Sequence, residues 1–280
     1  MASSVFTAFA AAMVLYCSFV ILDVPPNLIL LCATFLVIYS VYSLNRLTDQ
    51  EEDAINMPTR SAFVQGNERL LLILAAASYI AALVLGWVES PLAAGILFVP
   101  FLSGIIYSTD ALSTIGIPRL KDIFLVKSLI VAFSLTVCAA FLPALYLYGD
   151  FVKLWFVFPF IFIKIFINTV LFDVRDVDGD TLSGVKTIPV VIGITRTRQA
   201  LLILQSLLVL WLMLFLDIFS EYYIILIISI IYGYFYILYF CDEKEHSGVS
   251  WDVLLDGEWV LMSILIWIYF SIHTYLNVIA

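Results

Sequence analysis

Long apolar runs alternate with short polar segments along the whole chain. An apolar run of about 20 residues is long enough to cross a bilayer as a helix. We expect nine transmembrane helices, at residues 4–22, 27–45, 69–88, 91–108, 122–142, 152–172, 199–216, 221–240 and 259–278. The pattern therefore predicts an all-α, polytopic membrane protein built as a bundle of nine transmembrane helices. Residues 1–280 are expected to form a single integral membrane domain.

Composition supports this interpretation. The chain is 64% hydrophobic with a mean hydropathy of +1.10, which excludes a soluble globular protein. The first apolar run lacks a basic start and a clear cleavage site, so we interpret it as a retained helix and not as a signal sequence. The four cysteines form no CxxC pair, and neither a disulfide framework nor a zinc site is predicted.

The basic residues distinguish the two sides of the predicted bundle. When the loops are numbered from the N-terminus, the even loops and their edges hold eleven of the thirteen Lys and Arg residues, and the odd loops hold only Lys153. Basic residues favour the cytoplasmic side of a membrane. We therefore expect a cell-membrane protein with a cytoplasmic N-terminus and an external C-terminus. Membrane lipids are its expected surroundings, and no nucleic-acid partner is expected from a net charge of −9.

Two acidic clusters interrupt the apolar pattern where predicted helices two and six end. The clusters are residues 45–53 and 173–180, and together they contain eight carboxylates. Asp49/Asp53 and Asp176/Asp180 share a four-residue step, and the two pairs lie 127 positions apart. This recurrence suggests a four-helix unit used twice, followed by one further helix. Both clusters fall in even loops, so both are expected on the cytoplasmic face.

The spacing within each cluster predicts a stripe of oxygen ligands. Residues three or four apart lie on one face of a helix. The two stripes are Asn45, Asp49 and Asp53, and Asp173, Asp176 and Asp180. Mg²⁺ favours oxygen ligands and usually takes one or two carboxylates together with substrate phosphates and water. Two facing stripes would therefore hold Mg²⁺ around a diphosphate, whose leaving-group charge the metal would neutralise.

Acidic residues off the stripes have a simpler interpretation. Glu51, Glu52 and Asp178 do not follow the four-residue step, so we interpret them as solvated side chains at helix ends.

Several basic residues near the stripes are candidate ligands for the outer oxygens of a diphosphate. They are Arg60, Lys121, Lys127 and Lys186. The preference of basic residues for the cytoplasmic side explains the same positions without a ligand, so both interpretations remain open.

Lys164 is different because it lies within predicted helix six, where it shares a face with Asn168. An ionisable group at such depth usually faces a cavity or a partner. Either Lys164 and Asn168 line the upper part of the same cavity, or the Lys164 side chain extends to the lipid headgroups.

The two acidic segments resemble the motifs of the UbiA superfamily of intramembrane prenyltransferases. The first stripe, followed by residues 56–60, is similar to the family's NxxxDxxxD motif and its trailing Asn-x-Pro-x-Arg. The second stripe, followed by residues 184–189, is similar to the DxxDxxxD motif and its trailing Gly-x-x-Thr-x-Pro. Nine helices with cytoplasmic motifs after helices two and six also match, so the resemblance covers nearly the whole chain.

The resemblance implies a prenyltransferase, an enzyme that transfers alkyl or aryl groups other than methyl. Its reaction would be the Mg²⁺-dependent transfer of a prenyl group from a polyprenyl diphosphate to a lipophilic or aromatic acceptor. It implies catalytic and metal-binding roles for Asp49, Asp53, Asp173, Asp176 and Asp180, with Asn45 as a further metal ligand. Arg60 and Lys121 resemble the family's diphosphate-binding residues, and Tyr107 resembles a tyrosine at the end of helix four.

The chain departs from the family pattern in two places. Arg46 stands where many members have an acid after the asparagine. Residues 1–45 contain no Lys or Arg, whereas members commonly carry a basic residue near the first helix.

A membrane transporter or cation pathway with a cytoplasmic acidic site is the alternative, because acids within membrane proteins often mark ion routes. Such a route would place acids near the bilayer midplane. The predicted spans contain almost none, and the acids gather on one face. A catalytically silent scaffold is a third class, against which the repeated acidic pairs argue. The pattern favours the prenyltransferase.

Overall fold

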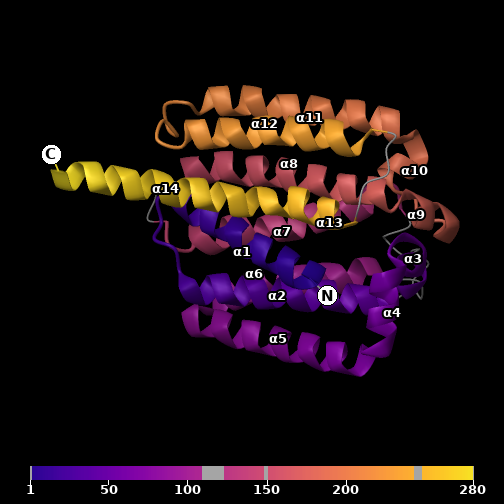
Figure 1. Cartoon of the computed structure of the whole chain (residues 1–280). Coiled ribbons are helices and arrows are strands. Elements are labelled where there is room, and N and C mark those ends of the chain that lie inside the picture. The colour runs from indigo at the N-terminus through magenta and orange to yellow at the C-terminus, as the bar shows by residue number, and fades with distance from the viewer. Residues whose placement is uncertain (1, 109–122, 148–150, 243–247, 280) are drawn as a thin grey trace.

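The structure is a bundle of long helices with short helices clustered at one end (Figure 1). The computed structural model describes residues 2–108, 123–147, 151–242 and 248–279, and within these ranges no strand is present. The prediction of an all-α chain is therefore confirmed for the described residues.

Each predicted apolar run falls largely within a long helix. These helices are α1 (Ala2–Ile21), α2 (Leu28–Thr48), α5 (Glu68–Glu89), α6 (Pro91–Ser108), α7 (Val126–Ala144), α8 (Val152–Arg175), α11 (Ile194–Leu214), α12 (Tyr223–Phe240) and α14 (Gly257–Ile279). By length and composition, eight segments of the described chain can cross a membrane. The apolar part of α6 is shorter, covering Pro91–Gly104. The chain is thus an integral membrane protein with eight candidate spans among its described residues.

The short helices connect the long ones at the end of the bundle where the acidic clusters lie. They are α3 (Gln50–Asn56), α4 (Pro58–Gly66), α9 (Val177–Ser183), α10 (Ile188–Ile192) and α13 (Gly248–Trp251), together with a π-helix, η3 (Asp252–Asp256). Proline fits the first turn of a helix because its missing N–H would have no partner there, and Pro58 and Pro189 occupy such positions in α4 and α10. Gly184 ends α9 with a φ of +75°, a conformation that glycine adopts without strain.

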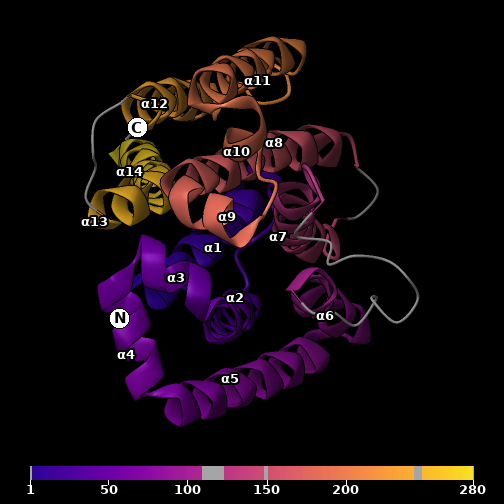
Figure 2. The same cartoon turned by 90° about the vertical axis from the view of Figure 1, so that its right-hand side faces the viewer.

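The long helices of the bundle pack against one another in pairs. Helix α2 packs against α1 and α5, α7 packs against α6 and α8, and α14 packs against α1 and α12. Figure 2, which looks along the helices, places α5 and the α11–α12 pair at opposite outer sides of the molecule. The start of α1 and the end of α14 lie toward opposite ends of the bundle (Figure 1).

Lys164 occupies the interior of the bundle, where one ion pair and two hydrogen bonds join three helices. Its Nζ lies 2.6 Å from Oε1 of Glu258 in α14, and both side chains are fully buried. Lys164 also donates a hydrogen bond to the backbone oxygen of Ser229 in α12 at 3.0 Å, and the Ser229 hydroxyl donates to Glu258 at 2.6 Å. Neither alternative for Lys164 matches this position, because the side chain reaches neither a described cavity nor the headgroups.

The last apolar helix also begins earlier than expected. The prediction placed its start at residue 259, whereas the candidate span runs from Asp252 to Ile272. Asp252, Asp256 and Glu258 therefore belong to this span. The expectation that the spans hold almost no acids is corrected here, because hydrogen bonds and ion pairs within the bundle accommodate these carboxyl groups.

The Lys164–Glu258 pair predicts a specific pattern of stability changes. Lys164→Met leaves a buried carboxylate without its counter-charge, and we expect a loss of about 3–5 kcal/mol in the free energy of unfolding. Adding Glu258→Gln should recover most of that loss, because glutamine is neutral and still accepts the hydrogen bond from Ser229. The measurement is equilibrium unfolding in detergent micelles.

The matched control for this prediction is Lys153→Met. Lys153 pairs with Asp23, whose side chain is 52% exposed, so its loss should cost less than about 1 kcal/mol. Equal losses in the two single variants would contradict the structural role of the Lys164 pair.

Candidate active site

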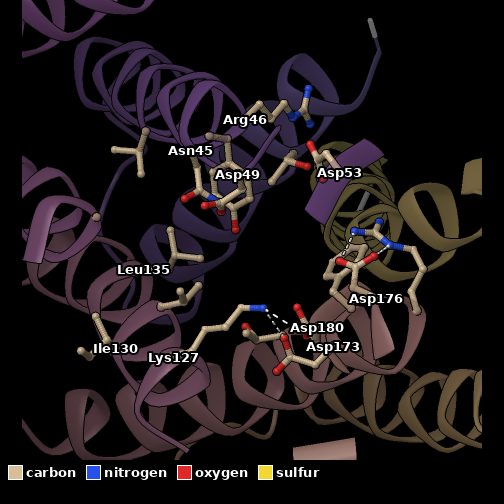
Figure 3. Close-up of a pocket in the computed structure, with 18 of the residues that line it drawn as sticks. Asn45, Arg46, Asp49, Asp53, Lys127, Ile130, Leu135, Asp173, Asp176 and Asp180 are labelled. Carbon is tan, nitrogen blue, oxygen red and sulfur yellow. Dashed lines mark hydrogen bonds and ion pairs between the residues drawn. The ribbon is translucent and has the colours of Figure 1, made fainter. Parts of the chain in front are cut away.

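The two acidic clusters line one cavity of about 190 Å³ at the end of the bundle. Asn45, Asp49 and Asp53 lie on one side of it, and Asp173, Asp176 and Asp180 lie on the other (Figure 3). The sequence placed these residues on two separate stripes, and the fold brings the stripes together across a single space.

Each stripe runs across a bend between two helices. Asp49 lies between α2 and α3, and Asp176 lies between α8 and α9. The backbone hydrogen bonds of the four-residue step continue through both bends. Asp49 and Asp53 donate to the carbonyls of Asn45 and Asp49 at 2.9 Å, and Asp180 donates to that of Asp176 at 3.0 Å. The stripes therefore keep their helical spacing although the helices change direction.

Asn56 joins the two acidic segments directly. Its side-chain oxygen accepts a hydrogen bond from the Gly179 N–H at 2.9 Å, and its amide nitrogen donates to the backbone oxygen of Asp176 at 3.3 Å. A Cβ at position 179 would lie 2.4 Å from the Asn56 amide nitrogen, so only glycine permits this approach. These contacts fix α3 against α9 and set the separation of the carboxylate stripes.

Basic side chains neutralise the carboxylates around the cavity. Arg60 pairs with Asp53 at 2.6 Å, and Arg175 pairs with Asp176 at 2.7 Å. These contacts are charge-assisted hydrogen bonds, which are stronger than hydrogen bonds between neutral groups.

Lys127 approaches both remaining carboxylates of the second stripe. Its Nζ lies 2.9 Å from Asp173 and 3.6 Å from Asp180. Burial, the largest cause, raises the pKa of the Asp180 carboxyl to about 6; Lys127 opposes the increase, whereas Asp173 and Asp176 contribute to it. Asp180 Oδ2 is buried and has no hydrogen-bond partner among the described residues, so it can accept a further ligand.

The chemistry of the donor set fits Mg²⁺. The ligand atoms that the two stripes present are all oxygens, which this hard cation prefers. Within the described part of the chain, no group of three or more His, Cys, Asp or Glu side chains is arranged to hold a metal ion. Mg²⁺ commonly completes its shell with substrate phosphates and water, so one or two carboxylates from each stripe suffice.

The other predicted site residues occupy different positions. Arg60 and Lys127 line the cavity, whereas Lys186 is exposed and does not line it. Lys121 lies outside the described residues, as does the side chain of Tyr107, although position 107 belongs to α6. Among the acids interpreted as solvated, Asp178 is exposed as predicted, and the side chains of Glu51 and Glu52 lie outside the described residues.

Three further charged residues line the cavity that were not among the predicted site residues: Arg46, Arg175 and Asp252. Arg175 lies within the second acidic segment, where the prediction rested on the carboxylates alone. Asp252 and Asp256 repeat the four-residue step of the acidic clusters, and this spacing is the signal that would have found them.

A second cavity of about 60 Å³ adjoins the first. Both cavities are lined by Thr7, Tyr42, Leu135, Thr169 and Phe172. The second cavity also contacts Asn168, so this residue lines the neighbouring space and not the one that holds the acidic stripes.

Comparisons with known proteins identify the family of the chain. The model of the UbiA prenyltransferase family matches residues 4–255. A comparison with curated protein sequences finds no match. The chain belongs to the UbiA prenyltransferase family, whose members transfer prenyl groups.

Solved structures show the same fold at low sequence identity. A UbiA homologue from Archaeoglobus fulgidus bound to GPP and Mg²⁺ has a TM-score of 0.71 and 15% identity, covering 94% of each chain. The apo UbiA homologue from Aeropyrum pernix K1 has a TM-score of 0.66 and 13% identity, covering 95% of this chain and 99% of that one. Almost the whole of the present chain therefore shares this architecture.

The Asn56 contacts predict the behaviour of α9. Asn56→Ala removes two hydrogen bonds, each worth about 1 kcal/mol, so local opening of α9 becomes easier. We expect amide hydrogen exchange in residues 177–183 to accelerate by about 30-fold, the factor that corresponds to a loss of roughly 2 kcal/mol.

The control is Asn67→Ala. Among the described residues, the Asn67 side-chain amide donates only to the backbone oxygen of Phe63 in the adjoining helix α4, at 2.9 Å. Unchanged exchange of α9 in Asn56→Ala, or the same acceleration in Asn67→Ala, would refute the role given to Asn56.

Proposed function

We propose that the protein transfers a prenyl group from a prenyl diphosphate to a lipophilic or aromatic acceptor, in a reaction that requires Mg²⁺. The observation that carries this proposal is the meeting of two acidic stripes across one cavity. The A. fulgidus homologue of the same fold, which was solved with GPP and Mg²⁺, supports the choice of substrate and metal.

The acidic stripes would hold the metal. When bound, Mg²⁺ neutralises charge on the diphosphate and so favours cleavage of the bond between oxygen and the prenyl carbon. The residues proposed to hold it are Asn45, Asp49, Asp53, Asp173, Asp176 and Asp180. Since ligands come from both sides of the cavity, binding would also fix the two stripes relative to each other.

Basic residues beside the stripes would bind the diphosphate. Arg60 and Lys127 already reach the cavity, where each is paired with a carboxylate. Cations in these positions can bind phosphate oxygens as the carboxylates turn toward metal. From their resemblance to family residues we also propose Lys121 as a diphosphate-binding residue and Tyr107 as a substrate-binding residue.

The remaining wall of the cavity is largely apolar, with hydroxyl-bearing side chains such as Ser103 and Ser134 among the apolar ones. Val41, Pro100, Ile130, Val131 and Leu135 line it, and Figure 3 shows Ile130 and Leu135 on the side away from Asp176. An apolar wall accommodates a prenyl chain and keeps water away from the reacting carbon. The cavity thus combines a polar part for the diphosphate with an apolar part for the hydrocarbon.

We further propose that residues 1–280 form one domain in which α6 is the ninth membrane span, giving two four-helix units and one additional helix. The distribution of basic residues supports a cytoplasmic position for the N-terminus and for the end that carries the acidic stripes. The opposite positions of the start of α1 and the end of α14 agree with an odd number of crossings. The cell membrane is the proposed location.

Single substitutions in the stripes test this function. Asp49→Asn and Asp176→Asn preserve side-chain size but remove an anionic ligand from each side of the cavity. We expect each to lower Mg²⁺-dependent prenyl transfer at least about 100-fold, the scale of losing one strong electrostatic contact in an active site. The assay follows transfer from GPP to a panel of lipophilic and aromatic acceptors.

Asp217→Asn makes the same chemical change at an exposed position between α11 and α12 and should leave turnover unchanged. Wild-type turnover in both stripe variants would rule out the proposed site.

Metal and diphosphate should bind cooperatively. The described side chains supply no ready group of three or more metal ligands, so Mg²⁺ needs the oxygens of a diphosphate to complete its shell. We expect a large rise in the thermal unfolding midpoint with Mg²⁺ and pyrophosphate together, and a small one with either alone.

A chelator should abolish both the joint stabilisation and the turnover, and added Mg²⁺ should restore them. Full stabilisation by Mg²⁺ alone would contradict the shared coordination.

A further inference from the structure

Three polar residues of the second cavity, Asp256, Asn168 and Thr34, do not line the cavity of the diphosphate site. Asp256, in the last turn of the π-helix η3, is 8% exposed and faces this cavity. The hydroxyl of Thr7 in α1 donates a hydrogen bond to Asp256 Oδ2 at 2.6 Å. A carboxyl group has more acceptor sites than this one bond uses, so Asp256 keeps acceptor capacity inside the bundle.

Two more buried polar atoms lie at the same cavity. Asn168 is 6% exposed and donates its amide hydrogen to the Leu255 carbonyl at 3.3 Å, but its oxygen has no hydrogen-bond partner among the described residues. The hydroxyl of Thr34, 3% exposed, likewise has none there. A buried polar group without a partner costs roughly 1–3 kcal/mol, so such a cluster is expensive unless a ligand or water satisfies it.

The size and position of the cavity suit a small head group. A water molecule needs roughly 10–15 Å³ of such space, so about 60 Å³ accepts a few polar atoms and not a long hydrocarbon. The cavity adjoins the apolar part of the first cavity, and a group bound in it lies beside the place proposed for the prenyl chain. A prenyl chain would bury hydrocarbon against a carboxyl group here, whereas a hydroxyl would satisfy the free acceptors.

The charge of the cavity limits which head groups fit. None of the described residues that line it is basic, and residues 1–45, which include all of α1, contain no Lys or Arg. A carboxylate-bearing ligand would therefore be buried beside Asp256 with no basic side chain in direct contact among the described lining residues, at a high energetic cost. An uncharged group that donates a hydrogen bond meets no such penalty.

We propose that the second cavity is the acceptor subsite, in which Asp256 and Asn168 select an uncharged acceptor head group that carries a hydroxyl. This assignment rests on the proposed prenyl transfer, for which the acceptor is the second substrate. Thr7 donates to one oxygen of Asp256, whose carboxyl group lines the cavity and would accept a hydrogen bond from the incoming hydroxyl. The π-helix, a form frequent at functional sites, places Asp256 on the cavity side at the start of the last span.

The test measures head-group binding directly and so does not depend on turnover. The probes are 4-methylphenol, its methyl ether 4-methylanisole, and 4-methylbenzoate, titrated into the full chain in lipid nanodiscs. We expect the phenol to bind at least about tenfold more tightly than the ether, because the ether leaves the buried acceptors unpaired. The benzoate should bind more weakly than the phenol by a similar factor.

Two variants distinguish the hydrogen-bonding effect of Asp256 from the effect of its charge. The double variant Thr7→Val/Asp256→Leu replaces both partners by apolar groups of similar shape, a change that folded proteins tolerate well. It should reduce the preference for phenol over ether to about twofold or less. Asp256→Asn keeps the size of the side chain but removes its charge, and it should raise the affinity for 4-methylbenzoate. Asp217→Asn is the control and should match the wild type in every titration.

Mg²⁺-dependent binding of GPP, measured in parallel, shows that each variant is folded. Equal binding of the phenol and the ether by the wild type would overturn the proposal, and so would an unchanged preference in the folded double variant. A wild-type protein that shows the phenol preference but binds no GPP with Mg²⁺ would overturn the proposed function, and with it the assignment of the subsite to an acceptor.

Discussion

The concentration of like charge at one end of the bundle is the constraint on which this structure depends. Two stripes of carboxylates face each other where the membrane helices end, and in a medium of low dielectric their repulsion would be costly. Arg60, Lys127 and Arg175 offset it through direct pairs with Asp53, Asp173 and Asp176. The same cations suit a diphosphate, and the same carboxylates suit a metal. The ion pairs that neutralise the cavity in the free protein therefore consist of the same groups that would bind the diphosphate and the metal.

Neutral contacts determine how far apart the stripes lie. The hydrogen bonds between Asn56 and the α9 backbone join the two acidic segments without adding charge, and Gly179 allows the approach. An ionic link in this position would compete with the ligands for the carboxylates. A polar but uncharged link leaves the carboxylates available. This explains why the segment trailing the first cluster carries an asparagine, which lines the cavity and contacts the Asp176 backbone without adding charge there.

The sequence predicted the helices and both stripes, because hydropathy and a four-residue spacing are local properties of the chain. It did not predict the partner of Lys164. Its partner Glu258 lies 94 positions away, and the apolar residues around each give no indication of pairing. The roles of Arg175 and Asp252 were missed for a related reason: which charge faces a cavity depends on how helices pack. The bends at Asp49 and Asp176 were also unexpected, although the spacing survived them because the backbone hydrogen bonds continue.

The two cavities divide the chemistry of a transfer reaction between them. The larger one has six carboxylates and four basic side chains among its described lining residues, which suits a highly charged leaving group and its metal. The smaller one has one carboxyl group and no described basic residue, which suits a neutral group that gives up a hydrogen bond. Leu135 and Phe172, with the hydroxyl-bearing Thr7, Tyr42 and Thr169, line both cavities and lie between the charged part and the acceptor part. The charged diphosphate is disfavoured in the smaller cavity, and the neutral head group is disfavoured in the larger one. The polarity of the two linings would therefore direct the two substrates to opposite sides of the reacting carbon.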